Sequence, residues 1–261
     1  MLHAAPPNLP AQCVNLAAEL ETLAGLENYH GWILDEIRPY LGTRLVEVGA
    51  GIGTFTKFLV QACLSHNPNA RLEAFEPDPA LYQRLRDQLE YSHPDLIRKG
   101  RLITTNGYFQ PSSVTRDTVV MINVLEHIQD DQESVRMVYQ SLSPGGSLIV
   151  YSPALQWLYS PHDKAVGHYR RYDVDQLEQV LRTEGFAVVV AKYMDCLGVL
   201  PWYLLNVVGG ATSISPRLAR FYDAYFVPLT RMVERRWQPS VGKNVLIVAH
   251  KRVVHSTLAK R

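Results

Sequence analysis

The feature that most constrains the fold is a glycine-rich turn that directly follows a short β-rich run. Residues 44–48 end in Val46-Glu47-Val48, and Gly49, Ala50, Gly51, Ile52 and Gly53 then lead into a predicted helix over residues 55–65. Glycine lets the backbone turn sharply and lets a ligand approach without a Cβ atom in the way. Strand, glycine turn and helix in this order are typical of a doubly wound sheet that binds ligands at the carboxyl ends of its strands. A turn that binds no ligand is the alternative.

The rest of the chain continues the alternation of strands and helices. Further strands are predicted over residues 71–75, 101–105, 117–122, 147–151, 186–191 and 244–249, and helices over 13–26, 28–41, 79–91, 131–142 and 174–182. This pattern predicts an α/β fold with a doubly wound, mostly parallel sheet of about seven strands. We expect one domain over residues 1–261, with N-terminal helices in 1–41. Residues 194–243 are too long for a turn and predict a helical insertion before the last strand.

Composition and charge exclude several other classes of protein. A chain with 47% hydrophobic and 20% charged residues is not intrinsically disordered. A net charge of +1 argues against a surface that binds nucleic acid by charge alone. The three cysteines are far apart and form no Cys-x-x-Cys pair, so no metal site is expected. The sequence carries no signal-peptide pattern and no apolar run long enough to span a membrane, so we expect a cytoplasmic protein.

An acidic residue after the second predicted strand narrows the ligand to a nucleoside. Glu76 ends that strand, in Phe75-Glu76-Pro77-Asp78, and a carboxylate there can accept both hydroxyls of a ribose. A solvated acid at a strand end is the alternative. The dinucleotide fingerprint needs a third glycine at position 54, where this chain has threonine. A nicotinamide cofactor is therefore disfavoured.

The chain resembles the class I S-adenosylmethionine-dependent methyltransferases. The resemblance rests on Glu47-Val-Gly-Ala-Gly-Ile-Gly53, Glu76-Pro-Asp78, Asn123-Val-Leu-Glu126-His127 and Pro144-Gly-Gly146, in the order of the family. It covers residues 28–193 and implies strand order 3-2-1-4-5-7-6 with an antiparallel seventh strand. It also implies S-adenosylmethionine as the cofactor. The residues expected at that cofactor are Glu47, Gly49, Ala50, Gly51, Gly53, Glu76, Pro77, Asn106, Gly107, Asn123 and Tyr29.

A polar segment after the fifth predicted strand is the candidate for the methyl acceptor. Residues 162–172 contain two histidines, two arginines, two tyrosines and an acid, and resemble a bacterial subgroup that acts on glycans or secondary metabolites. A histidine oriented by a carboxylate can remove a proton near neutral pH, so His162, Asp163 and His168 are the catalytic candidates. A charged surface loop, with Asp173 capping the next helix, is the alternative. The substrate-binding candidates are His127, Tyr169, Arg170, Arg171, Tyr172 and Trp202.

These observations favour methyl transfer to a small-molecule, glycan or lipid-linked acceptor, at oxygen rather than nitrogen or carbon. A catalytically inactive binding protein and an RNA methyltransferase are the rivals. The Pro-Pro pair of enzymes that methylate base amines is missing after Asn123, and no nucleic-acid partner is expected. The insertion carries aromatic and arginine residues. It can be a lid, a dimer element, an interfacial membrane contact or an extension of the core. Either a monomer or a homodimer is expected.

Overall fold

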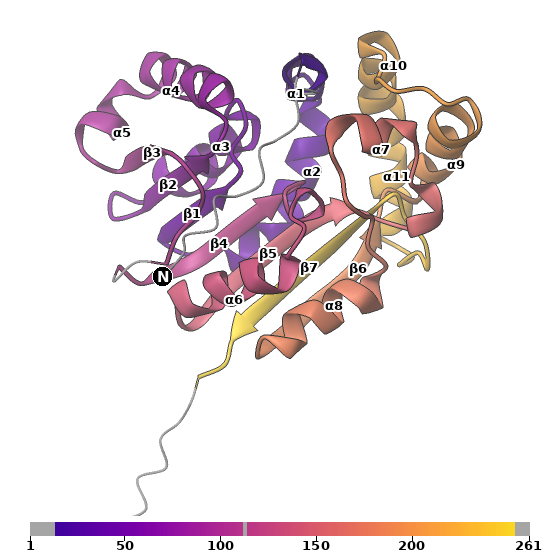
Figure 1. The fold of residues 1–261 in the computed structure, drawn as a ribbon. Coiled ribbons are helices and arrows are strands. Elements are labelled where there is room, and N and C mark those ends of the chain that lie inside the picture. Colours follow the sequence, from indigo (N-terminus) through magenta and orange to yellow (C-terminus); the bar gives the residue numbers. More distant parts are fainter. Residues whose placement is uncertain (1–13, 112–113, 254–261) are drawn as a thin grey trace, which may run out of the picture.

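The computed structural model describes residues 14–111 and 114–253, and the seven strands in that part of the chain form one sheet (Figure 1). Their order is β3-β2-β1-β4-β5-β7-β6, and β7 runs antiparallel to both of its neighbours. Both features confirm the prediction. The strands are β1 (Arg44–Val48), β2 (Arg71–Glu76), β3 (Leu102–Asn106), β4 (Arg116–Ile122), β5 (Leu142–Pro153), β6 (Phe186–Met194) and β7 (Asn244–Lys251). Cys13 and the rest of the N-terminal segment before α1 lie outside the described residues.

Helices cover both faces of the sheet. They are α1 (Val14–Ala24), α2 (Glu27–Ile37), α3 (Thr54–Leu59), α4 (Pro79–Ser92), α5 (Pro94–Arg98), α6 (Asp131–Ser141), α7 (Pro161–Val166), α8 (Val174–Thr183), α9 (Val199–Trp202), α10 (Pro216–Phe221) and α11 (Val227–Glu234). The two short helices α5 and α7 were not predicted, because neither is long enough to show helical periodicity. Each begins with a proline, a residue that suits the first turn of a helix.

The core consists of two apolar layers, one on each face of the sheet. Val119 and Met121 of β4 pack with residues of α6 and α8, whereas Val120 packs with residues of α2, α3 and α4. Side chains alternate between the faces of a strand, so a strand covered on both sides is apolar throughout. This explains the continuous apolar run that the sequence shows in the fourth strand.

The helical insertion lies between β6 and β7 and stands beyond the carboxyl ends of β4 and β5 (Figure 1). Helices α10 and α11 are joined by a wider, π-helical turn over Tyr222–Phe226, just before Pro228. Proline lacks the amide donor that a regular helix needs, which accounts for a wider turn at this point. Within the described residues, no helix is both long and apolar enough to cross a membrane.

Candidate active site

The turn between β1 and α3 contains three glycines at the carboxyl edge of the sheet, and its residues are mostly buried. Gly49, Gly51 and Gly53 all have positive φ angles, of 69°, 59° and 87°. A Cβ atom at Gly49 would lie 2.6 Å from Val124 Cγ2, so the turn after β4 packs directly on the glycine turn. A Cβ at Gly51 would meet only the side chain of Leu20, from α1. Helix α1 therefore covers this turn.

Glu76 lies at the end of β2 and reaches the glycine turn. Its Oε2 accepts the backbone N–H of Gly51 at 2.7 Å, and its Oε1 accepts the N–H of Asp78 at 2.9 Å. Burial raises the pKa of Glu76. Asp78 instead caps α4, since its Oδ1 accepts the N–H groups of Ala80 and Leu81. Asp78 is therefore a helix cap, whereas the carboxylate of Glu76 points toward the glycine turn.

Glu47 is buried inside the same turn. Thr56 Oγ1 donates to Glu47 Oε2 at 2.6 Å, which ties the start of α3 to β1. Burial raises the pKa of Glu47 to about 8, and the nearby charge of Glu76 adds to the rise. The carboxyl group of Glu47 is therefore held within the protein, in a form that tends to be neutral.

The ends of β3 and β4 complete this edge. Asn106 Nδ2 and the N–H of Gly107 both donate to the carbonyl oxygen of Glu76, at 2.9 and 3.0 Å. Asn123 has a φ of 53°, and its buried Oδ1 has no hydrogen-bond partner among the described residues. A glycine turn, a carboxylate and an unsatisfied amide oxygen at one edge fit a nucleoside cofactor. Pro77 and Ala50 lie in the same turns.

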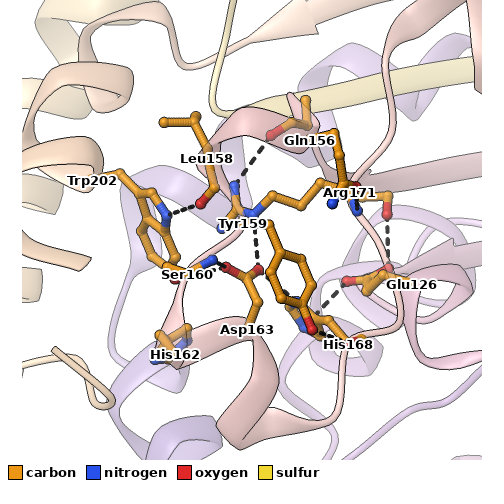
Figure 2. A network of polar contacts seen from close by, with 12 residues as sticks. Glu126, Gln156, Leu158, Tyr159, Ser160, His162, Asp163, His168, Arg171 and Trp202 are labelled. Carbon is orange, nitrogen blue, oxygen red and sulfur yellow. Dashed lines mark hydrogen bonds and ion pairs between the residues drawn. The ribbon is translucent and has the colours of Figure 1, made fainter. Parts of the chain in front are cut away.

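A second polar cluster lies beside the glycine turn, at the ends of β4 and β5 (Figure 2). Its centre is Asp163 of α7, which is fully buried. His168 Nδ1 lies 2.8 Å from Asp163 Oδ1, Arg171 Nε donates to the same oxygen at 2.8 Å, and Ser160 Oγ donates to Oδ2 at 2.7 Å. Burial alone would raise the pKa of Asp163, but the His168 hydrogen bond and the Arg171 charge outweigh it and lower the pKa to about 2.

Glu126 and His127 face this cluster from the turn after β4. Ser152 Oγ donates to Glu126 Oε2 at 2.8 Å, whereas Oε1 has no hydrogen-bond partner among the described residues. His168 Nε2 lies 4.0 Å from that oxygen. Burial raises the pKa of Glu126, and burial lowers the pKa of His127 to about 3. The His127 and His168 rings meet edge to face at 4.5 Å.

The three predicted catalytic residues do not form one group. His168 and Asp163 are paired, but the buried His162 points elsewhere. Its Nε2 lies 3.0 Å from Glu19 Oε1 of α1, and its Nδ1 lies 3.3 Å from the carbonyl oxygen of Thr212. His162 therefore connects α7 to the covering helix α1 and to the insertion.

Several predicted substrate residues are bonded within the protein. Arg171 and Tyr172 are buried, although the sequence favoured a substrate-facing role for both. Arg171 binds Asp163, and Tyr172 OH donates to Asp131 Oδ2 at 2.8 Å. Arg170 donates to the same Asp131 oxygen at 2.7 Å. Asp163, Arg171 and Tyr172 are thus buried, with their polar groups paired inside the protein, whereas other residues of the segment reach the surface.

Trp202 and Tyr29 also make polar contacts within the protein. Trp202 Nε1 donates to the carbonyl oxygen of Leu158 at 3.1 Å, and the Arg171 guanidinium lies 4.6 Å from its ring centre. Tyr29 OH bonds to Tyr151 OH at 2.7 Å and to Asn244 Oδ1 at 2.9 Å, over β5 and β7 rather than at the glycine turn. Of the predicted substrate residues, Tyr169 is exposed.

Sequence reasoning did not predict where Glu126 lies, nor the hydrogen bonds that fix the start of α7. Glu126 was only part of a family motif, and nothing in the local sequence indicates that one of its oxygens is unpaired. Ser160 and Asp163, in contrast, form a capping box at the start of α7. The spacing Ser-x-x-Asp is a sequence signal for such a box and could have predicted this helix.

Two surface hollows among the described residues lie away from both clusters. The larger, of about 330 Å³, is lined by residues of α2 and α3 and by Arg231. The smaller lies between α2, β6 and the end of α11. Neither hollow contains a predicted site residue. We therefore place the candidate site at the strand ends, on the basis of the polar residues there.

Comparisons with known proteins agree with this geometry. Residues 46–148 match a family model described as a methyltransferase domain. A comparison with curated protein sequences finds no match. Many solved structures share the fold. One is an S-adenosylmethionine-dependent methyltransferase from Mesorhizobium loti, with a TM-score of 0.58 and 15% identity over 87% of this chain and 100% of that chain.

Two other solved structures show how varied proteins with this fold are. Phosphoethanolamine N-methyltransferase 2 of Haemonchus contortus, in complex with S-adenosyl-L-methionine, has a TM-score of 0.60 and 14% identity over 95% of this chain and 62% of that chain. The [4+2]-cyclase SpnF has a TM-score of 0.56 and 16% identity over 87% of this chain and 82% of that chain. At such identities these likenesses establish the fold alone.

Proposed function

We propose that the chain is a class I S-adenosylmethionine-dependent methyltransferase and that it methylates a hydroxyl group of a small-molecule, glycan or lipid-linked acceptor. The proposal rests on one observation, which is that two sites lie in contact at one edge of the sheet. The glycine turn and Glu76 form the first, and Glu126, Asp163 and His168 form the second. Val124 packs against Gly49 and lies two residues before Glu126, so the two sites adjoin.

In this proposal the first site holds the cofactor. Glu76 accepts the ribose hydroxyls with the lone pairs that its two backbone bonds leave free, and the glycine turn lies along the methionine part. Asn106 and Gly107 lie at the adenine end. When bound, the cofactor supplies a methyl group on a positively charged sulfur, which is already a good electrophile. The chain's own residues need only orient the acceptor, exclude water and handle one proton.

We propose that the second site accepts the proton of the acceptor hydroxyl. The carboxylate of Asp163 fixes the His168 ring, so that Nε2 faces Glu126 Oε1. When the acceptor oxygen is methylated, its O–H bond would break and the proton would pass to this cluster. A hydroxyl needs such help, because it is a weak nucleophile until it loses its proton.

The insertion supports an acceptor with an apolar part. Its helices carry exposed apolar side chains among arginines, and they stand beyond the strand ends where the two sites lie (Figure 1). An apolar surface with arginines suits a lipid-linked molecule at an anionic membrane surface. Co-sedimentation with vesicles that contain anionic lipid tests this part. The exposed side chains are Leu200, Leu204, Leu205, Val208, Leu218, Phe221, Tyr225, Arg217 and Arg220.

Comparing two histidine variants tests the assignment of the proton. We expect His168→Ala to lower kcat by ~10²–10⁴-fold, with unchanged affinity for S-adenosylhomocysteine. His162→Ala removes the contact with Glu19 and should instead lower stability or raise KM. Turnover is measured with labelled S-adenosylmethionine and the acceptor found by screening metabolite and lipid extracts. Equal kcat in both variants would remove His168 from the reaction.

The same screen separates the rival functions. A binding protein that has lost catalysis would bind S-adenosylmethionine but label no acceptor, and the cyclase SpnF is a solved example of this fold with a different activity. An RNA methyltransferase would label RNA and shift it in a gel in a salt-dependent way. The net charge of +1 disfavours that rival.

A further inference from the structure

Three potential ligand groups converge on one small space at the ends of β4 and β5. A carboxylate oxygen of Glu126 and one ring nitrogen each of His127 and His168 all lie within 4.8 Å of one another. The distance of 4.0 Å between His168 Nε2 and Glu126 Oε1 is too long for a hydrogen bond. Two ligands that each lie about 2.0–2.2 Å from one ion are at most about 4.0–4.4 Å apart, so an ion bound between these atoms would draw them slightly closer together.

The unsatisfied oxygen of Glu126 points to what that space holds. Glu126 is fully buried, and its Oε1 has no hydrogen-bond partner among the described residues, whereas its Oε2 is bound by Ser152. Buried oxygens of this kind are normally satisfied by a donor or by a cation. Because the oxygen faces the two imidazoles, a cation placed between them would satisfy all three groups.

Asp163 orients His168 as a metal ligand is usually oriented. With its proton on Nδ1, bonded to Asp163 Oδ1 at 2.8 Å, His168 directs the lone pair of Nε2 toward Glu126. The lone pair of His168 Nε2 then faces a lone pair of Glu126 Oε1, and the two repel each other. A cation bound between them would attract both. Ring nitrogens that bind metals commonly have a carboxylate on the opposite nitrogen in this way.

We propose that Glu126, His127 and His168 bind one divalent transition-metal ion, and that this ion holds the acceptor oxygen. Two imidazoles and one carboxylate favour ions such as Zn²⁺, Mn²⁺ or Co²⁺ over Mg²⁺ and Ca²⁺, which prefer oxygen ligands. Such a set of three leaves coordination positions open. With the ion bound, His168 Nε2 is a ligand and no longer the base, and a hydroxyl on the ion would lose its proton to solvent because the ion lowers its pKa. This last step rests on the proposed function, whereas the ion site itself does not.

Binding of Co²⁺ to the chelator-treated full chain tests the site without any acceptor. We expect one Co²⁺ per chain by calorimetry and a visible absorption band that reports bound nitrogen ligands. Glu126→Gln and His168→Gln should each weaken Co²⁺ binding by at least tenfold. Asp163→Asn, a change to a positioning residue, should weaken it by ~10–100-fold. The exposed His66→Ala variant is the matched control and should bind as wild type does.

Circular dichroism of each metal-free variant checks that it is folded. If a variant does not fold, Co²⁺ binding by the wild-type protein alone decides whether the site exists. A folded wild type that binds no stoichiometric Co²⁺, or variants that bind as tightly as wild type, would overturn the proposal. If the metal-free enzyme methylates its acceptor at the full rate, the ion has no role and the proposed function stands. If Co²⁺ binds but no acceptor is methylated, the site stands and the proposed function fails.

Discussion

At the scale of single residues, two neighbouring carboxylates at one edge of the sheet make different contacts. Glu76 accepts a backbone N–H of the glycine turn, whereas Asp78 caps α4 and turns away from that edge. The local sequence places both at the end of β2, but only the direction of each side chain separates a ligand-binding group from a structural one.

Replacing Glu76 tests this separation. Glu76→Ala should weaken S-adenosylhomocysteine binding by ~1.5–3 kcal/mol, the range for hydrogen bonds to a charged group. Asp78→Ala is the control. It should lower the free energy of unfolding by about 1 kcal/mol through loss of the cap, with little change in affinity. Calorimetry and chemical denaturation give the two quantities, and unchanged affinity in Glu76→Ala would remove Glu76 from the cofactor site.

At the scale of elements, the insertion stabilises a helix that lies far from it in the sequence. Leu26, the residue before α2, offers no side-chain cap. Asp223 fills this role, since its carboxylate accepts the N–H of Tyr29 at 2.8 Å and that of Asn28 at 3.2 Å. A carboxylate also suits the positive end of the helix dipole. The insertion is therefore tied to the N-terminal helices as well as to the sheet.

This contact predicts a stability effect across about 195 residues of chain. Asp223→Ala should lower the free energy of unfolding by about 0.5–2 kcal/mol, as for other lost helix caps. Asp223→Asn keeps an accepting oxygen and should lose less. Chemical denaturation of both variants provides the measurement. If the alanine and asparagine variants are as stable as wild type, the contact contributes nothing.

At the scale of the whole molecule, burial of Glu47 makes stability depend on pH. Burial raises its pKa from an ordinary 4.5 to about 8 in the folded protein. The folded state therefore holds the proton more tightly than the unfolded chain does. Its contribution to stability is complete below pH 4.5 and is lost as pH rises toward 8.

Glu47→Gln removes this dependence, because glutamine stays neutral at every pH. The difference in Tm between the variant and wild type should grow in favour of the variant as pH rises from 5 to 8.5. The exposed Glu90→Gln variant serves as the control and should show no such trend. Thermal melts at several pH values measure the effect, and a constant difference would contradict the buried, neutral form of Glu47.

The resemblance to a known family implied the strand order, whereas the sequence by itself determined the alternation of strands and helices, the glycine turn and the acid at the end of β2. Each of these last three rests on local chemistry: apolar periodicity, the freedom of glycine at positive φ, and the place of a residue relative to its own strand. The tertiary structure alone decided that His168, and not His162, pairs with Asp163, and that Arg171 and Tyr172 lie inside. Those outcomes depend on contacts between distant segments, which set the burial and charge around each side chain. The same contacts leave one oxygen of Glu126 without a partner, and no local pattern carries that information.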